Sequence, residues 1–140
     1  MTGLRILVTG SRAWTDRAAV ADALRWAITN HHPRPTRQQV TVVHGAARGA
    51  DTLAGQVAAG WGVHVEAHPA DWDRHGKAAG PLRNVHMVGL GADICLAFPI
   101  GESRGTRHCM GLAQAAGIRV IDWPVEHAQL MARGGGVVVR

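Results

Sequence analysis

The strongest constraint on the fold is an alternation of short apolar runs with longer amphipathic segments. The apolar runs cover residues 4–10, 40–45, 63–69, 92–99 and 118–124. The segments between them repeat apolar residues every three or four positions, as Val20, Leu24 and Ala27 do. This is the period of a helix with one buried face. Strands that alternate with helices of this length predict βαβ units and a parallel sheet.

The predicted sheet belongs to a single three-layer α/β/α domain that spans all 140 residues. Right-handed crossovers, with helices on both faces, predict five parallel strands in the order 3-2-1-4-5. We expect residues 4–123 to form the core of the domain and residues 124–140 to form a C-terminal extension. The final segment of that extension, GGGVVVR, is either disordered or an additional edge strand.

Composition limits the setting in which the protein works. No apolar stretch approaches the roughly 20 residues that a membrane helix needs. The start, MTGLRILVTG, lacks the long apolar run and the cleavage site of a signal peptide. Cys95 and Cys109 are the only cysteines, and Cys95 falls in an apolar run. We therefore expect a reduced, cytoplasmic protein that does not associate with a membrane.

Glycines and arginines concentrate in the loops that follow the predicted strands. In an open parallel sheet these loops lie at the carboxyl edge, where ligands bind near the switch in strand order. The loops carry eight of the 15 basic residues and five of the 10 acidic ones. Glycines, exposed backbone N–H groups and arginines together complement an anion such as phosphate. The alternative is a solvated charged surface, since a net charge of +5 does not by itself define a site.

The predicted ligand-binding residues come from four of these loops. Small residues allow a phosphate to approach the backbone, and Asp51 either caps the second helix or accepts hydrogen bonds from ribose hydroxyls. Arg83 falls at the expected start of the third helix, where its charge opposes the helix dipole, so it should face a phosphate or a carboxylate. The full set is Gly10, Ser11, Arg12, Gly45, Arg48, Gly49, Asp51, Trp72, Lys77, Arg83, Asn84, Gly105 and Thr106.

Aromatic and histidine side chains on the same edge allow further interpretations. Trp14 and Trp72 either close the core or stack on a base, and Trp72 in its long loop is the better candidate for stacking. The nine histidines form no HExxH motif and no zinc-type spacing, so we expect no metal site and no cofactor. His44 and His108 lie in edge loops and are candidates for acid–base chemistry.

Six motifs follow one another along the chain: GSRxWxD (10–16), HGAARGAD (44–51), PADW (69–72), GKAAGPLRNVHM (76–87), AFP (97–99) and GT (105–106). This ordered set resembles the SLOG superfamily, and within it the small single-domain YspA/YpsA-related branch of bacteria and phages. The resemblance implies a Rossmann-like fold that binds a nucleotide or a nucleotide-derived ligand, as a sensor or a carrier would. Its relatives include the LOG phosphoribohydrolases, which cleave the base from a nucleoside monophosphate, and the DprA proteins, which bind single-stranded DNA.

The resemblance to LOG enzymes implies catalytic residues that this sequence matches in part. Arg83 and Met87 match their Arg-x-x-x-Met pattern, and Gly105-Thr106 matches part of Gly-Gly-x-Gly-Thr-x-x-Glu. Cys109 stands where that pattern has its glutamate, so we expect base release to be weak or absent.

Three functions therefore stay open. The leading one is the binding of a nucleotide or nucleotide-derived ligand. The second is a nucleotide hydrolase in which Arg83, Asp51 and Glu102 act. The third is DprA-like binding of single-stranded nucleic acid, which positive charge and exposed tryptophans suggest. The resemblance to LOG proteins also implies a homodimer.

Overall fold

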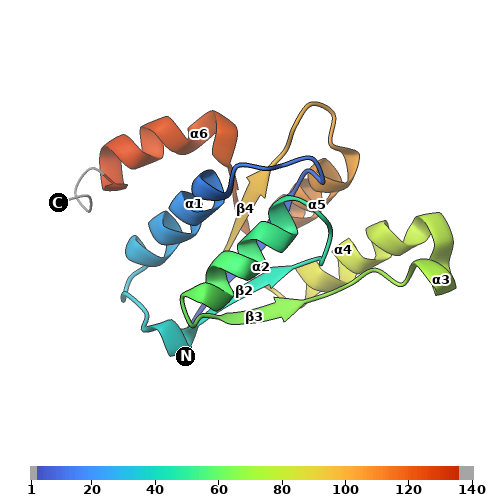
Figure 1. Ribbon diagram of the computed structural model, residues 1–140, viewed down its shortest axis with the longest axis horizontal. Coiled ribbons are helices and arrows are strands. Elements are labelled where there is room, and N and C mark those ends of the chain that lie inside the picture. Colours follow the sequence, from blue (N-terminus) through green and yellow to red (C-terminus); the bar gives the residue numbers. More distant parts are fainter. Residues whose placement is uncertain (1–2, 136–140) are drawn as a thin grey trace.

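The computed structural model describes residues 3–135 and contains a five-stranded parallel sheet (Figure 1). Every pair of neighbouring strands is parallel, and their order is β3-β2-β1-β4-β5. The predicted Rossmann-like α/β fold and the predicted order 3-2-1-4-5 are therefore confirmed. The strands are β1 (Leu4–Gly10), β2 (Val40–His44), β3 (His64–Ala67), β4 (Ile94–Phe98) and β5 (Arg119–Asp122).

Helices cover both faces of the sheet and form the outer two layers. Short 3-10 turns occupy Arg37–Gln39 and Gly76–Ala78, and a π-helical segment, Met131–Gly135, follows the last helix. Within residues 3–135 no helix is long and apolar enough to cross a bilayer. Residues 136–140, on which most of the GGGVVVR prediction falls, lie outside the described residues. The helices are α1 (Arg17–Thr29), α2 (Ala50–Gly60), α3 (Trp72–His75), α4 (Ala79–Gly89), α5 (Arg104–Ala115) and α6 (Trp123–Leu130).

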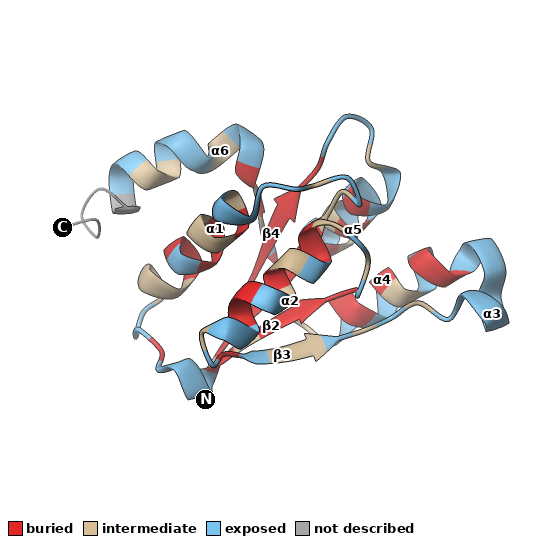
Figure 2. Cartoon of the chain, viewed as in Figure 1, coloured by how far each residue is buried: buried red, intermediate tan, exposed pale blue. Residues whose placement is uncertain are grey.

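Alternating side chains of the central strands divide the buried residues between two layers. Ile6 and Val8 of β1 pack into a cluster with α1, α2 and Trp123, whereas Leu7 packs into a second cluster with α4 and α5. Successive strand residues point to opposite faces, so a central strand covered on both sides has to be apolar throughout. Figure 2 shows this burial along β2 and β4.

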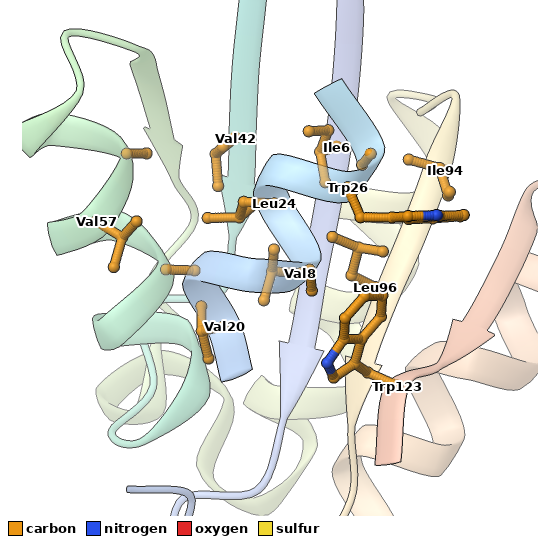
Figure 3. Packing of buried hydrophobic residues seen from close by; sticks show 14 of the residues in the cluster. Ile6, Val8, Val20, Leu24, Trp26, Val42, Val57, Ile94, Leu96 and Trp123 are labelled. Carbon is orange, nitrogen blue, oxygen red and sulfur yellow. The ribbon is translucent and has the colours of Figure 1, made fainter. Parts of the chain in front are cut away.

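The larger cluster fixes how α1 lies on the sheet. Val20 and Leu24 point from α1 toward Ile6 and Val8 (Figure 3). At the end of the same helix, the rings of Trp26 and Trp123 lie 5.9 Å apart, a tilted aromatic pair. The side chain of Asp16 caps α1 by accepting a hydrogen bond of 3.0 Å from the Ala19 N–H.

The connections place the loops of interest at one edge of the sheet. The chain leaves β1 toward α1 on one face and leaves the neighbouring strand β4 toward α5 on the other face. The two loops therefore diverge between β1 and β4, and a gap opens at the carboxyl ends of these strands. This topology, rather than any single motif, locates the candidate site.

Candidate functional site

A crevice of about 500 Å³ lies at the carboxyl ends of β1 and β4. Its lining comes from the loop after β1, from the beginning of α2, from α3 and α4, and from the first turn of α5. The topology thus brings together most of the residues that the sequence singled out. The predicted residues that line the crevice are Gly10, Ser11, Arg12, Asp51, Trp72, Arg83, Asn84, Gly105 and Thr106.

A second opening, which we call the side hollow, adjoins the crevice. It measures about 400 Å³ and is lined by Gly45, Arg48, Pro69 and Ala70 together with residues that also line the crevice. The shared residues are Arg12, Ala47, Trp72 and Arg83. Two of the predicted residues, Gly45 and Arg48, thus lie beside the crevice rather than in it.

Three other predicted residues do not line either opening. Gly49 is the N-cap of α2 and has a φ of 78°, and a Cβ there would collide with the backbone oxygen of Ser11. It therefore serves the close approach of two loops. Lys77 and Glu102 are exposed outside both linings. The structure consequently does not bring Glu102 to the position of a substitute catalytic acid.

The first turn of α5 presents backbone donors to the crevice. Its N-cap residue, Ser103, is in the left-handed region (φ 44°, ψ 59°) and makes no side-chain cap. Instead the Ser103 hydroxyl donates to Oγ1 of Thr106 at 3.0 Å. The first N–H groups of a helix have no partner within the helix, and the dipole favours negative charge there. Exposed Arg104 adds a full positive charge at the same place.

Arg83 and Asn84 connect the loops that enclose the crevice. The Nε of Arg83 donates to Oδ1 of Asn84 at 2.8 Å, and Nη1 donates to the carbonyl oxygens of Gly45 and His68. The amide of buried Asn84 donates in turn to the carbonyl oxygen of Gly105 at 3.3 Å. Arg83 thus ties α4 to the segments that follow β2 and β3, and Asn84 ties α4 to α5.

The expected position of Arg83 at the start of a helix is wrong. The helix α4 begins at Ala79, so Arg83 is its fifth residue and lies beyond the uncapped first turn. The partners of its guanidinium are an amide and two backbone carbonyl oxygens rather than a carboxylate. Within residues 3–135, Nη2 of Arg83 has no hydrogen-bond partner, which leaves it available to a ligand.

Asp51 shapes the loop between β2 and α2. Its side chain is 5% exposed, and Oδ2 accepts hydrogen bonds from the N–H groups of Gly45 (2.9 Å) and Ala47 (3.5 Å). Burial raises the pKa of this carboxyl to about 6, against the effect of those N–H groups and of two nearby arginines. Asp51 also lines the crevice, whereas the N-cap of α2 is Gly49. The structure therefore gives Asp51 a role in loop closure that neither sequence alternative contained.

The buried position of Cys109 bears on the resemblance to LOG enzymes. Its side chain is fully buried between α5 and the sheet, where burial raises the pKa of the thiol to about 11. A thiol of this kind is neither an acid–base group nor an activated nucleophile at neutral pH. The position that the LOG pattern assigns to a catalytic glutamate is thus part of the core.

The two candidate histidines have different environments. His44 is 7% exposed, and its Nδ1 accepts a hydrogen bond of 2.9 Å from the Ala46 N–H. Burial lowers its pKa, and it lines neither opening. His108 does line the crevice, with Nδ1 lying 3.3 Å from the amide nitrogen of Asn84. Only His108 is therefore placed for chemistry on a bound ligand.

The two loop tryptophans also differ. Trp14 packs against Phe98 with ring centroids 5.3 Å apart, and its Nε1 donates to the carbonyl oxygen of Asp16. It closes the core. Trp72 is 49% exposed and lines both the crevice and the side hollow. The guanidinium of Arg12 lies over the Trp72 ring, 5.6 Å from its centroid.

Several lining residues were not predicted from the sequence. Ser103 and Arg104 directly precede the Gly105-Thr106 motif, and this adjacency would have identified them. Thr9, Ala47 and the Gly80-Pro81 pair also line the crevice, and each lies next to a predicted residue or inside one of the quoted motifs, so the same signal would have identified them.

Comparisons with known proteins agree with the fold and the motifs. The family model described as YAcAr: YspA, cpYpsA-related SLOG family matches residues 4–75. The Gene 61 protein of Mycobacterium phage D29 is 53% identical over 124 residues, which cover 85% of this chain and 95% of that protein. No solved structure matches the chain significantly. The matched family region includes the loops after β1 and β2.

Proposed function

Because the chain belongs to the YspA, cpYpsA-related SLOG family, we propose that its crevice binds a nucleotide or a nucleotide-derived ligand containing ribose and phosphate. Family membership suggests a nucleotide-related role in general terms. The position of the crevice, outside the carboxyl ends of two strands that diverge at a switch point, is where open α/β sheets bind such ligands.

The observation that carries the proposal is the first turn of α5. A phosphate there would accept hydrogen bonds from uncapped backbone N–H groups and would lie beside Arg104. Gly105 leaves room for it, since a Cβ at this residue would meet no protein atom within 4 Å. Ser103, Thr106 and Arg12 line the same crevice and carry further hydrogen-bond donors.

The remaining lining suits the rest of a nucleotide. Buried Asp51 and exposed His108 offer polar atoms to ribose hydroxyls, and the exposed Trp72 ring offers a surface on which a base stacks. Apart from Asp51, no acidic residue lines the crevice among the described residues, so an anionic ligand meets little repulsion.

The residues of the crevice fit a protein that binds the nucleotide without cleaving the base from the ribose. A phosphoribohydrolase needs a carboxylate near the ribose, where positive charge develops in the transition state. Cys109 is buried in the core, and Glu102 does not line the crevice. The one carboxylate that does, Asp51, has its Oδ2 engaged by the N–H groups of Gly45 and Ala47. We therefore assign the protein to ligand sensing or carriage rather than to hydrolysis.

A thermal-shift screen tests this proposal. Nucleoside mono-, di- and triphosphates, NAD and ADP-ribose are each added at fixed ionic strength to wild type, Arg104→Ala and Arg34→Ala. Arg34 is an exposed arginine near Val40, where β2 begins, at the opposite end of the sheet from the crevice. Arg34→Ala therefore removes the same charge as Arg104→Ala but away from the proposed site. Stabilisation by at least one nucleotide, reduced in Arg104→Ala alone, is expected. Equal losses in both variants would attribute binding to bulk charge and contradict the proposal.

A further inference from the structure

The crevice and the side hollow are joined rather than separate, because they share four residues. Arg12, Ala47, Trp72 and Arg83 line both openings. Each opening alone is within the range of about 300–1,000 Å³ that is usual for small-molecule sites. A ligand that filled only the crevice would leave the side of these four residues that faces the side hollow uncovered; we call these four residues the shared surface.

Resting on the function proposed above, we infer that the ligand continues across Trp72 and Arg12 into the side hollow. The ligand class is then a nucleotide whose diphosphate is linked onward to a second ribose, rather than a nucleoside monophosphate. One nucleoside lies in the crevice with its first phosphate at the first turn of α5, the second phosphate lies beside the shared Arg12 and Arg83, and the second sugar lies in the side hollow.

Positive charge continues along this path. Arg104 lies only in the crevice, Arg12 and Arg83 lie at the shared surface, and Arg48 lies only in the side hollow. Among the described residues no aspartate or glutamate lines the side hollow. Two phosphates in sequence would therefore meet arginine at each position, whereas a monophosphate would use only the first.

The hydrogen bonds of Arg83 leave one donor at the shared surface. Nε and Nη1 are held by Asn84, Gly45 and His68, which fixes the plane of the guanidinium. Nη2 has no partner within residues 3–135. A half-buried guanidinium that is fixed in this way is pre-organised for an anion, because little side-chain freedom remains to be lost on binding.

The apolar part of the side hollow suits a sugar or a second ring. Pro69 and Ala70 form one side of it, and the half-exposed Trp72 ring stands at its boundary with the crevice. Arg48 is exposed and has no hydrogen-bond partner within residues 3–135, so its removal disturbs no contact of the fold.

Isothermal titration of the full chain with AMP, ADP and ADP-ribose tests the inference. Wild type is expected to bind ADP-ribose at least about tenfold more tightly than AMP or ADP. Arg48→Ala should reduce the ratio of ADP-ribose affinity to AMP affinity by about tenfold, because one charge-assisted hydrogen bond is lost. Arg34→Ala, the matched control at the other end of the sheet, should leave this ratio unchanged.

The outcomes separate this inference from the function on which it rests. One outcome is that AMP binds, that Arg104→Ala lowers the affinity for AMP, and that ADP-ribose binds no more tightly than AMP or ADP. This outcome overturns the inference, while the proposed function stands. A ratio that Arg48→Ala leaves unchanged also overturns the inference alone. If none of the three probes binds, the inference is overturned, and the proposed function is then decided by the thermal-shift screen with the other nucleotides.

Discussion

The guanidinium of Arg83 occupies the space that a side chain at residue 45 would need. A Cβ built on Gly45 would lie 2.5 Å from Nη1 and 2.6 Å from Cζ of Arg83. The same guanidinium donates to the carbonyl oxygen of Gly45, although 38 residues separate the two along the chain. The glycine of the HGAARGAD motif and the arginine of α4 are therefore one structural unit that holds the boundary of the crevice.

Gly45→Ala should destabilise the protein, because either Arg83 or the backbone of residue 45 has to move. We expect a loss of about 1–3 kcal/mol in the free energy of unfolding, as for other overpacked sites. Gly105→Ala is the matched control, since its Cβ would meet nothing within 4 Å and alanine favours a helix. Urea denaturation measures both variants. Equal stability of Gly45→Ala and Gly105→Ala would show that Arg83 does not fill this space.

Arg83→Ala should lower both stability and nucleotide affinity. Its loss leaves the part-buried carbonyl oxygens of Gly45 and His68 without this donor, which costs about 1–3 kcal/mol. The interpretation of Arg83 as an unfavourably placed helix-start cation predicts the opposite, namely little change in folding. Arg83→Lys should recover part of both properties, because an ammonium cannot donate in the two-pronged geometry of arginine. Urea denaturation measures the stability of each variant, and titration with ADP-ribose measures its affinity. If Arg83→Ala were as stable as wild type, the structural role of Arg83 would be refuted.

Asp51 should make stability fall as pH rises through its raised pKa. Below pH 3.8 the carboxyl is protonated in both the folded and the unfolded protein, and between 3.8 and about 6 only the folded protein keeps the proton. At higher pH the folded protein has to bury a carboxylate. A shift of this size corresponds to about 2–3 kcal/mol.

The comparison of wild type with Asp51→Asn isolates that effect, because the other titrating groups are common to both proteins. The free energy of unfolding of wild type, minus that of the variant, should decrease between pH 4 and about 6 and then level off. Urea denaturation at several pH values measures it. A difference that stays constant or increases with pH would contradict the assignment.

Cys109 should react slowly with thiol reagents in the folded protein. Full burial and a pKa of about 11 leave little thiolate at neutral pH. Labelling by an aromatic disulfide should therefore be limited by unfolding, for Cys109 and for the equally buried Cys95. Rapid modification of Cys109 in native protein, with the Cys95→Ala variant used to assign the signal, would contradict the burial of this thiol in the core.

The period of the apolar residues predicted the sheet, and the rule of right-handed crossovers with helices on both faces predicted its strand order. Strand β1 was predicted with its observed bounds, 4–10, because it is apolar on both faces and ends at a turn glycine. The predicted strand 63–69 was too long, since β3 covers only His64–Ala67 and lies at the sheet edge, where polar residues are tolerated. The start of α4 was missed because Ala79 and Gly80 carry no capping signal.

The crevice could be predicted in outline but not in its internal contacts. Gly10 ends β1, Arg12 follows it, and Thr106 lies in the first turn of the helix after β4. A parallel sheet brings these positions to one edge, so topology alone groups them. The bond from Arg83 to the carbonyl of Gly45 depends on how α4 packs against β2, which no local pattern encodes. The role of Asp51 was also missed: the sequence suggested helix capping or a hydrogen bond to ribose. Its hydrogen bonds to the N–H groups of residues 45 and 47 depend on the conformation of that loop, which no local pattern encodes.

The most direct test of the central claim is an NMR titration that maps which backbone amides respond to a nucleotide. The protein, of 14.8 kDa, is uniformly labelled with ¹⁵N, and AMP, CMP, GMP, UMP and ADP-ribose are added in turn. We predict that the largest amide shifts occur at Ser11, Arg12, Gly105 and Thr106, around the first turn of α5. Largest shifts at Arg34 and Arg37 beside the start of β2, or no saturable shifts with any of the five, would contradict it.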